Sequence, residues 1–225
     1  TASFEQNYPL LVEKNGFRIA MLNYTYAING ATVHAPNIVN RIDTAKISID
    51  IEKSKSMEPD AIIAFMHWGE EYKLEPVSSQ KKMADWLFEK GVTHIIGGHP
   101  HVVEPIEIRT DSITGEKHLL AYSLGNFLSN STRQNTYAEM TIRLDLEKDS
   151  TVRISNCDYS LYFVSNPPNN GRKQFRIYPV TVPDSLLNAF ESYRKHIVTD
   201  TIRAFLNENN KGVKERLVEF SQYGK

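Results

Sequence analysis

The chain opens with two apolar runs, at residues 8–12 and 17–24, separated by a short polar stretch that contains Asn15-Gly16. Asn-Gly between two apolar runs is a strong signal for a hairpin, so these runs predict a pair of antiparallel strands. The polar residues 25–42 that follow contain a second Asn-Gly pair and a proline, and they predict a loop.

The next part of the chain alternates helical patterns with short apolar runs. Asp43 predicts the N-cap of a helix over about 44–56; the isoleucines there lack a clean helical period, which leaves a strand open, but the length and the charges favour a helix. Ser78 or Ser79 predicts the cap of a helix over about 80–90. The apolar runs at 61–66 and 93–96 are typical of buried strands. The order strand, helix, strand, helix, strand predicts a parallel unit with right-handed crossovers.

From residue 105 the pattern changes to alternating strands and then to helices. We expect antiparallel hairpins over 105–109 with 117–122 and over 136–147 with 151–164, a strand at 175–182, and helices at about 184–197, 199–207 and 212–220. The fold class is therefore α/β: a parallel βαβαβ unit, then antiparallel strands, then C-terminal helices. Residues 1–182 are expected to form one portion of a domain, and residues 183–225 a helical extension packed on it.

Composition excludes some classes of partner. The 225 residues carry a formal net charge of −1 with 40% apolar and 24% charged residues, so neither nucleic acid nor an anionic membrane is expected to bind. Cys157 is alone and forms no internal disulfide. No apolar run approaches the roughly 20 residues of a transmembrane helix, so membrane attachment is expected only through a segment outside this chain. The start at Thr1 predicts a processed or trimmed product.

Two predicted parallel strands end in loops that carry histidine. His67 follows the first strand, and Gly97-Gly98-His99-Pro100-His101 follows the second. Ligands of open α/β sheets bind beyond the carboxyl ends of the strands, so His67, His99 and His101 are expected to meet in one crevice. With Glu70 or Glu71 beside them, they predict a divalent-metal site. The glycines would let the backbone turn sharply and approach a ligand, and Pro100 would fix the direction of the two imidazoles.

Other candidate residues have a structural alternative. Trp68 is either a core residue or the wall of a substrate pocket, and Glu70 is either a solvated charge or a substrate contact. The remaining histidines, His34, His94, His118 and His196, are interpreted as structural. Ser123 suggests a serine hydrolase, but the chain lacks the G-x-S-x-G elbow, which argues against that class. Asn126 could point into the same crevice from a Gly-Asn turn.

Three phrases resemble the C-terminal half of the CapA-type poly-γ-glutamate capsule biosynthesis proteins. They are FMHWGEEYKLEP, GVTHIIGGHPHVVEPIEI and LLAYSLGNFLSN, and YPLLVEKNGFRIAMLNYTY resembles the strand pair before them. These proteins are similar to calcineurin-like metallophosphoesterases, which fold as an α/β sandwich. The resemblance implies a two-metal site in which His67 and His99 ligate one ion and His101 the other, with Glu71 and Asn126 as candidates for catalysis.

The chain also departs from that superfamily. It lacks the earlier D-x-H, G-D and G-N-H-[DE] motifs, and Phe127 stands where the last of these would have its histidine. We therefore expect half of a metallophosphatase-like domain, with its N-terminal half as a partner, and weak or no metal binding by this chain alone.

The resemblance implies a function only for the complete domain. It would be a metal-dependent hydrolase of capsule biosynthesis that acts on a phosphoester, a peptide or an anionic polymer. The complete domain would use Mn, Zn or Fe, as one ion or two. The expected location is the cell envelope or the extracellular face. The alternative is a non-catalytic module that binds a polyanion or assembles a cell-surface system, with Arg172 near the Pro-Pro loop as a candidate contact.

Overall fold

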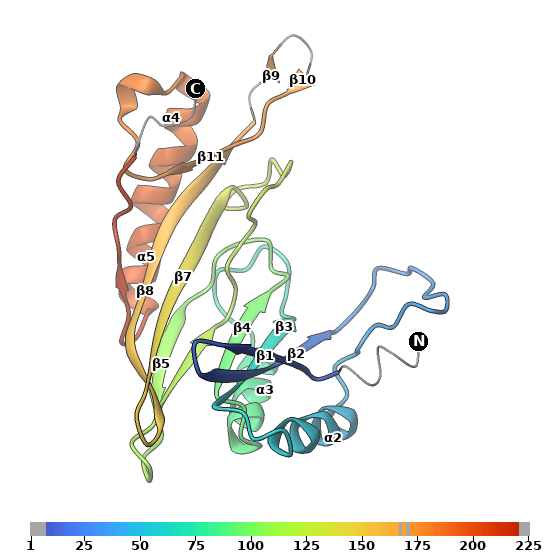
Figure 1. Ribbon diagram of the computed structural model, residues 1–225. Helices are drawn as coiled ribbons and strands as arrows, with labels where there is room; N and C mark the ends of the chain where they lie inside the picture. Colours follow the sequence, from blue (N-terminus) through green and yellow to red (C-terminus); the bar gives the residue numbers. More distant parts are fainter. Residues whose placement is uncertain (1–7, 167, 170–171, 221–225) are drawn as a thin grey trace.

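The computed structural model describes residues 8–166, 168–169 and 172–220; for 168–169 and 172–173 it describes the backbone only. It shows a mixed α/β fold with two main sheets (Figure 1). The first sheet has six strands: β1 (Leu10–Lys14), β2 (Phe17–Thr25), β3 (Ala61–His67), β4 (His94–Gly98), β5 (Ile106–Thr110) and β6 (Lys117–Ala121). Their order in space is β1-β2-β3-β4-β6-β5.

The centre of this sheet is parallel. The pairs β2–β3, β3–β4 and β4–β6 are parallel, whereas β1 and β5 run antiparallel to their neighbours at the two edges. The sequence predicted three parallel strands and both hairpins. The structure adds β6 as a fourth parallel strand, because Ile95 and Ile96 pair with Leu120 and Ala121. The carboxyl ends of β3 and β4 therefore lie at the same edge of the sheet.

Two helices cover one face of this sheet. In α2 (Thr44–Lys55) the predicted cap is confirmed: Asp43 Oδ1 accepts hydrogen bonds from the backbone N–H groups of Ala45 and Lys46. In α3 (Ser78–Glu89) the predicted serine cap is wrong, because the N-cap is Val77. Gln80 Oε1 accepts the backbone N–H of Val77 at 2.8 Å, so a side chain from the first turn reaches back to the N-cap residue, as in the second half of a capping box.

The first hydrophobic core lies between these helices and the parallel strands. It contains, among others, Leu22, Ala64 and Ile95 from the strands and Ile47, Ile51, Ala84 and Leu87 from the helices. The opposite face of the sheet belongs to a second core, since Leu119 and Ala121 alternate with Leu120 along β6. β6 is thus buried on both faces. The apolar runs of β3 and β4 predicted the same, but Ile63, Phe65 and Ile96 on their second face are half-buried.

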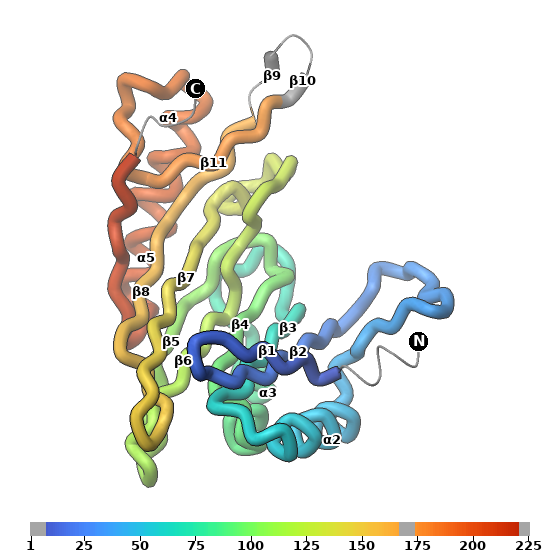
Figure 2. The backbone as a smooth tube through the Cα atoms, in the orientation of Figure 1, coloured from blue at the N-terminus to red at the C-terminus, as the bar shows by residue number. Residues whose placement is uncertain are grey.

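The second sheet is built around one long strand. β8 (Val152–Ser165) pairs antiparallel with β7 (Ala138–Lys148) and β11 (Arg176–Pro179), and parallel with the short β12 (Lys214–Glu215). The β7–β8 hairpin extends along the C-terminal helix, and the loop between β2 and α2 stands away from the body (Figure 2). A two-residue ribbon, β9 (Pro168–Asn169) with β10 (Arg172–Lys173), follows β8.

The C-terminal helices form one continuous rod after the short η1 (Asp184–Leu186). α4 (Ala189–His196), the π-helical segment η2 (Ile197–Ile202) and α5 (Arg203–Asn209) follow one another without a break, so the predicted interruption near residue 198 is wrong. Four buried residues spaced by four, Arg194, Val198, Ile202 and Leu206, define the inward stripe. None of the helices in the described part of the chain combines the length and apolar composition that crossing a bilayer requires.

The helix predicted at 212–220 is also wrong. Gly212 has φ +73°, and the next residues form β12 against Asp158 and Tyr159 of β8. Glu215 accepts two hydrogen bonds from Arg203, at 2.7 and 2.8 Å, and this half-buried pair holds the segment against α5. The exposed edge of β8 supplies backbone partners that outweigh the local helical preference of the segment.

Candidate metal centre

The parallel pairing of β3 and β4 brings the histidine loops together. His67 lies opposite Gly98 in the register, so His67 and His99 are neighbours across the two strands. Their ring centres are 4.6 Å apart, and the rings of His99 and His101 are 6.0 Å apart. The three imidazoles that the sequence singled out therefore lie side by side at the carboxyl edge of the sheet, as expected.

One group of side chains at this edge has the spacing of a metal site. One ligand atom from each of Glu71, His99 and His101 lies within 4.8 Å of the others. Zn²⁺ takes histidine nitrogens and carboxylate oxygens as ligands at roughly 2.1 Å, so the chemistry of this donor set fits one divalent ion. His67 is outside this group but adjoins His99. Metal ligation by these residues stays a prediction.

The H-x-H backbone is unusual at both histidines. His99 has φ +108° and His101 has φ +62°, a region that non-glycine residues seldom occupy. Such conformations cost free energy and occur mostly where a functional arrangement demands them. The expectation that Gly97 and Gly98 supply the sharp turn is wrong, since neither has positive φ. Gly97 instead permits a close approach: a Cβ there would collide with the Tyr122 carbonyl oxygen.

Asn126 determines which nitrogen of His101 is free. The amide nitrogen of Asn126 donates to two backbone carbonyls, those of His101 and Thr136, at 3.1 and 2.8 Å. Its oxygen must then face His101 Nδ1, 2.9 Å away, and can only accept. Nδ1 of His101 therefore carries the proton, and Nε2 keeps the lone pair that a metal ion needs.

The same reasoning applies to His67. The hydroxyl of Thr25 donates to the carbonyl oxygen of Ala27 at 2.7 Å and lies 2.8 Å from His67 Nδ1. Since its proton is already used, the hydroxyl oxygen accepts from Nδ1–H. Nε2 of His67 is then also the nitrogen with the free lone pair, and the tautomers of two of the histidines suit ligation.

Burial around the histidines favours their neutral form. Burial is the main cause that lowers the pKa of His67, and the charge of His101 lowers it further. Burial also lowers the pKa of His99, with His67 adding to the shift and the carboxylate of Glu71 opposing it. Neutral imidazole is the form that ligates metal, so this environment prepares the rings for an ion.

Two tyrosines complete the walls. The ring of Tyr26 lies 5.8 Å from that of His67 and 4.5 Å from that of His99, and the ring of Tyr72 stacks on His101 at 5.9 Å. The sequence analysis missed Thr25, Tyr26 and Tyr72. Tyr72 lies five residues after His67 in the same loop, and this short separation could have indicated that its ring adjoins the site. Thr25 is the last residue of β2 and Tyr26 follows it, and only the pairing of β2 with β3 places them here.

The other candidate residues lie in different settings. Glu70 pairs with Lys73 at the surface and is not a member of the metal-binding group. Trp68 is a core residue whose Nε1 donates to the Tyr122 carbonyl oxygen at 2.9 Å, although it also lines a cavity of about 300 Å³ with Tyr26. Its contact with substrate stays a prediction. The side chain of Arg172 lies outside the described residues.

Ser123 and two of the remaining histidines have structural partners. Ser123 is fully buried, and its hydroxyl donates to the Val102 carbonyl oxygen at 2.8 Å, which is incompatible with an accessible nucleophile. His94 Nδ1 accepts the backbone N–H of Leu119, and burial lowers the pKa of His94 to about 4. His118 Nδ1 bonds to the carbonyl oxygen of Thr93. The structural interpretation of His94 and His118 is confirmed.

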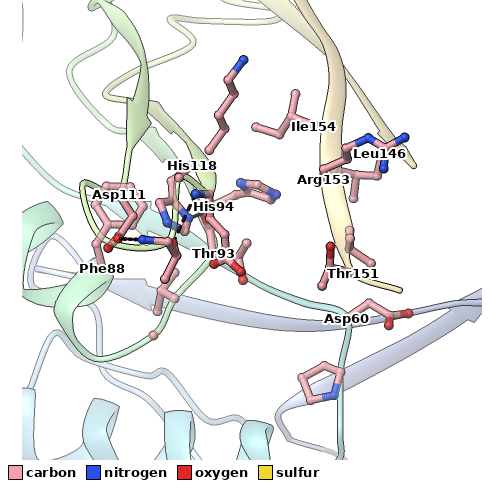
Figure 3. A pocket seen from close by; sticks show the side chains of 18 residues that line it. Asp60, Phe88, Thr93, His94, Asp111, His118, Leu146, Thr151, Arg153 and Ile154 are labelled. Carbon is pink, nitrogen blue, oxygen red and sulfur yellow. Dashed lines mark hydrogen bonds between the residues drawn. The ribbon is translucent and has the colours of Figure 1, made fainter. Parts of the chain in front are cut away.

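A larger cavity lies at the other end of the parallel strands. It has a volume of about 720 Å³ and is lined by residues that precede or begin the strands, including Asp60, Thr93 and His94, together with Arg153 of β8 (Figure 3). Its size exceeds that of the cavity near Trp68, but it contains none of the clustered imidazoles. We place the candidate chemistry at the histidine cluster, because donor atoms and not volume determine where a metal binds.

Two solved structures match this chain at low sequence identity. The sulfate thiohydrolase SoxB of Thermus thermophilus is 13% identical, with a TM-score of 0.38 over 86% of this chain and 29% of that chain. The NAD nucleotidase NadN of Haemophilus influenzae is 11% identical, with a TM-score of 0.42 over 93% of this chain and 38% of that chain. TM-scores this low do not establish a shared fold.

Curated relatives match in sequence. The PGA biosynthesis protein CapA of Bacillus subtilis is 29% identical over 143 residues, which are 62% of this chain and 35% of the relative. The capsule biosynthesis protein CapA of Bacillus anthracis is 26% identical over 142 residues, 61% of this chain and 33% of the relative. The chain thus matches about a third of the length of these relatives. A family model, the bacterial capsule synthesis protein PGA_cap, matches residues 2–131, which contain the whole histidine cluster. The chain belongs to the bacterial capsule synthesis protein family PGA_cap.

Proposed function

We propose that this chain is part of a capsule biosynthesis protein and carries a divalent-metal site for hydrolysis of an anionic substrate. The observation that supports this is the grouping of Glu71, His99 and His101, whose ligand atoms lie within 4.8 Å of one another at the edge of a parallel sheet. The second support is the hydrogen bonding of His67 and His101, which leaves Nε2 of both rings available.

The protein's own residues have separable roles in this proposal. His99, His101 and Glu71 would hold the ion, with His67 as an additional ligand or as the ligand of a second ion. Asn126 and Thr25 would orient His101 and His67 without touching the ion or the substrate. A bound divalent ion would supply Lewis-acid activation and lower the pKa of water. The rings of Tyr26 and Tyr72 would shield the site from bulk solvent on two sides.

The substrate class follows from the relatives. One of them is described as a PGA biosynthesis protein, and we infer that poly-γ-glutamate, a phosphoester or a related anionic polymer of the cell envelope is the substrate. An envelope location accords with capsule biosynthesis. A single carboxylate in the metal-binding group leaves the ion with positive charge that attracts an anionic substrate.

The test combines metal content with turnover. The chain, and a version extended to the length of the curated relatives, would be purified and assayed for bound metal by elemental mass spectrometry. Hydrolysis of a γ-linked glutamate oligomer and of bis-p-nitrophenyl phosphate would then be measured. We expect His99→Ala to lose both metal and turnover in the extended protein. His34→Ala is the matched control, because His34 is an exposed loop residue far along the chain from the cluster.

A second candidate function is a binding module without catalysis. The observation that favours it is that Glu71 is the one acidic member of the metal-binding group among the described residues. Two-metal hydrolysis ordinarily uses more carboxylates than that. If the extended protein binds γ-linked glutamate oligomers, contains no metal and hydrolyses neither compound, this second function is the correct one.

A further inference from the structure

We propose that Arg133 recognises an oxyanion of the substrate, a carboxylate or a phosphate, beside the candidate metal centre. The inference rests on the proposed function, because it identifies the group that the substrate presents next to the site. It is carried by the position of Arg133, by the contacts that fix that position, and by the absence of a carboxylate partner among the residues that the structure describes.

The guanidinium group lies one aromatic ring away from His101. Its carbon, Cζ, is 4.2 Å from the centre of the Tyr72 ring, and Tyr72 stacks on His101 with ring centres 5.9 Å apart and planes inclined by 20°. The backbone N–H of Tyr72 donates to the Pro100 carbonyl oxygen at 2.7 Å, which ties this ring to the H-x-H segment. A cation on an aromatic face is held in place while its N–H edge stays open.

A second route of contacts connects Arg133 to the same histidine. The hydroxyl of Thr136, which is fully buried, donates to the carbonyl oxygen of Arg133 at 2.7 Å. The carbonyl oxygen of Thr136 in turn accepts from Asn126, the residue that orients His101. Both the side chain and the backbone of Arg133 are thus positioned relative to the candidate site. A surface arginine without a function has no need of this arrangement.

The charge of Arg133 is uncompensated. Six other arginines form ion pairs with carboxylates: Arg18, Arg109, Arg143, Arg153, Arg203 and Arg216. Within the described residues no Asp or Glu lies within ion-pair distance of Arg133, which is exposed. A guanidinium fork that is exposed, positioned and unpaired is the group best suited to bidentate binding of an oxyanion.

The intervening ring determines which part of the substrate Arg133 would meet. Because Tyr72 lies between Arg133 and the rings of the candidate site, the guanidinium would contact a charged group adjacent to the bond that is cleaved, not the reacting atoms. Arg133 is therefore a specificity residue. The substrates it favours carry an anion next to the reactive bond, as each residue of a γ-linked glutamate chain or a phosphoester with a second phosphate does.

The test measures binding of two probes to the chain, with and without Zn²⁺. Inorganic phosphate and a γ-linked glutamate pentamer would be titrated by calorimetry into the wild type and into Arg133→Gln, Arg133→Lys and Arg143→Gln. We expect Arg133→Gln to raise Kd for at least one probe about tenfold, the size of one charge-assisted contact. The Kd of Arg133→Lys should lie between those of the wild type and Arg133→Gln, since lysine keeps the charge and loses the guanidinium fork. Arg143→Gln, an exposed arginine paired with Asp145, should leave Kd unchanged.

The outcomes separate this inference from the proposed function. If Arg133→Gln raises Kd only for the pentamer, the oxyanion that Arg133 recognises is a carboxylate. If it raises Kd only for inorganic phosphate, the oxyanion is a phosphate. Zn²⁺ stoichiometry should be equal in the wild type and Arg133→Gln. If the wild type takes up no Zn²⁺, this chain alone does not form the metal site and the extended protein decides that proposal. The metal-free titration still tests Arg133, because its contact with an oxyanion needs no ion. Wild-type Kd values in Arg133→Gln, or no measurable binding of either probe to the wild type, would overturn the inference.

Discussion

Asn126 contacts His101 at two points: its side-chain oxygen lies 2.9 Å from the ring Nδ1, and its amide nitrogen donates to the His101 carbonyl oxygen at 3.1 Å. One side chain thereby fixes both the tautomer of the ring and the backbone of a residue at φ +62°. Since Asn126 was singled out as a candidate for catalysis, its position suggests a different role. We expect Asn126 to act through His101, which the predictions below test.

The first prediction follows from this relationship. Asn126→Ala should weaken Zn²⁺ binding about 10- to 100-fold, because His101 loses the partner that holds Nδ1–H and so directs Nε2 outward. Competition with a chromophoric chelator measures the affinity. Asn156→Ala is the control, since Asn156 is exposed and bonds only to aspartates of β7 and β8. Equal affinity in Asn126→Ala and the wild type would show that His101 needs no such support.

The second prediction concerns the choice of metal. The group of two imidazoles and one carboxylate should bind Zn²⁺ or Ni²⁺ weakly in this chain alone and Mg²⁺ or Mn²⁺ hardly at all, because the harder ions prefer oxygen ligands. Parallel calorimetric titrations with the four ions measure this order, with His99→Ala as the control. Tight Mg²⁺ binding by the isolated chain would mean that oxygen ligands outside this group complete the site.

The third prediction compares two adjacent glycines. A Cβ on Gly97 would meet the Tyr122 backbone and lie 2.5 Å from Trp68 Nε1, whereas a Cβ on Gly98 meets nothing within 4 Å. Gly97→Ala should therefore lower the free energy of unfolding by about 3 kcal/mol or more, as overpacking against backbone does. Gly98→Ala should change it by about 0.5 kcal/mol at most. Urea denaturation of both variants measures the difference, and equal stabilities would contradict the close packing at Gly97.

The fourth prediction concerns pH and Glu139. This carboxyl group is 1% exposed, its two oxygens have no hydrogen-bond partner among the described residues, and burial raises its pKa to about 8. Between its ordinary pKa of 4.5 and about 8, the folded protein keeps this proton and the unfolded chain loses it. The free energy of unfolding should therefore fall as pH rises through this window, by up to about 1.4 kcal/mol per pH unit from this group.

Glu139→Gln tests that prediction, because the amide stays neutral at every pH. The variant should gain stability relative to the wild type at pH 8 and differ little from it at pH 4.5. Burial also raises the pKa of Glu104 to about 8, so part of the pH dependence should remain in the variant. Denaturation curves at several pH values measure both effects. Identical pH profiles for the variant and the wild type would show that Glu139 is ionised in the folded protein.

Local patterns in the sequence determined most of the elements. These include the Asn15-Gly16 turn and the Asp43 cap, which act through neighbours in the chain, and the apolar runs that form β3 and β4. All are found as expected. The same reasoning placed the histidine loops at one edge of the sheet, since parallel strands present their carboxyl ends together.

Tertiary structure decided what depends on distant partners. Residues 212–220 have the composition of a helix, but the edge of β8 offers them a strand pairing that no local pattern shows. The tautomers of His67 and His101 depend on Thr25 and Asn126, which are 42 and 25 residues away along the chain. The sequence by itself identified which imidazoles meet. Only the folded chain determined which of their nitrogens are free, because a proton's position depends on hydrogen bonds that long-range packing creates.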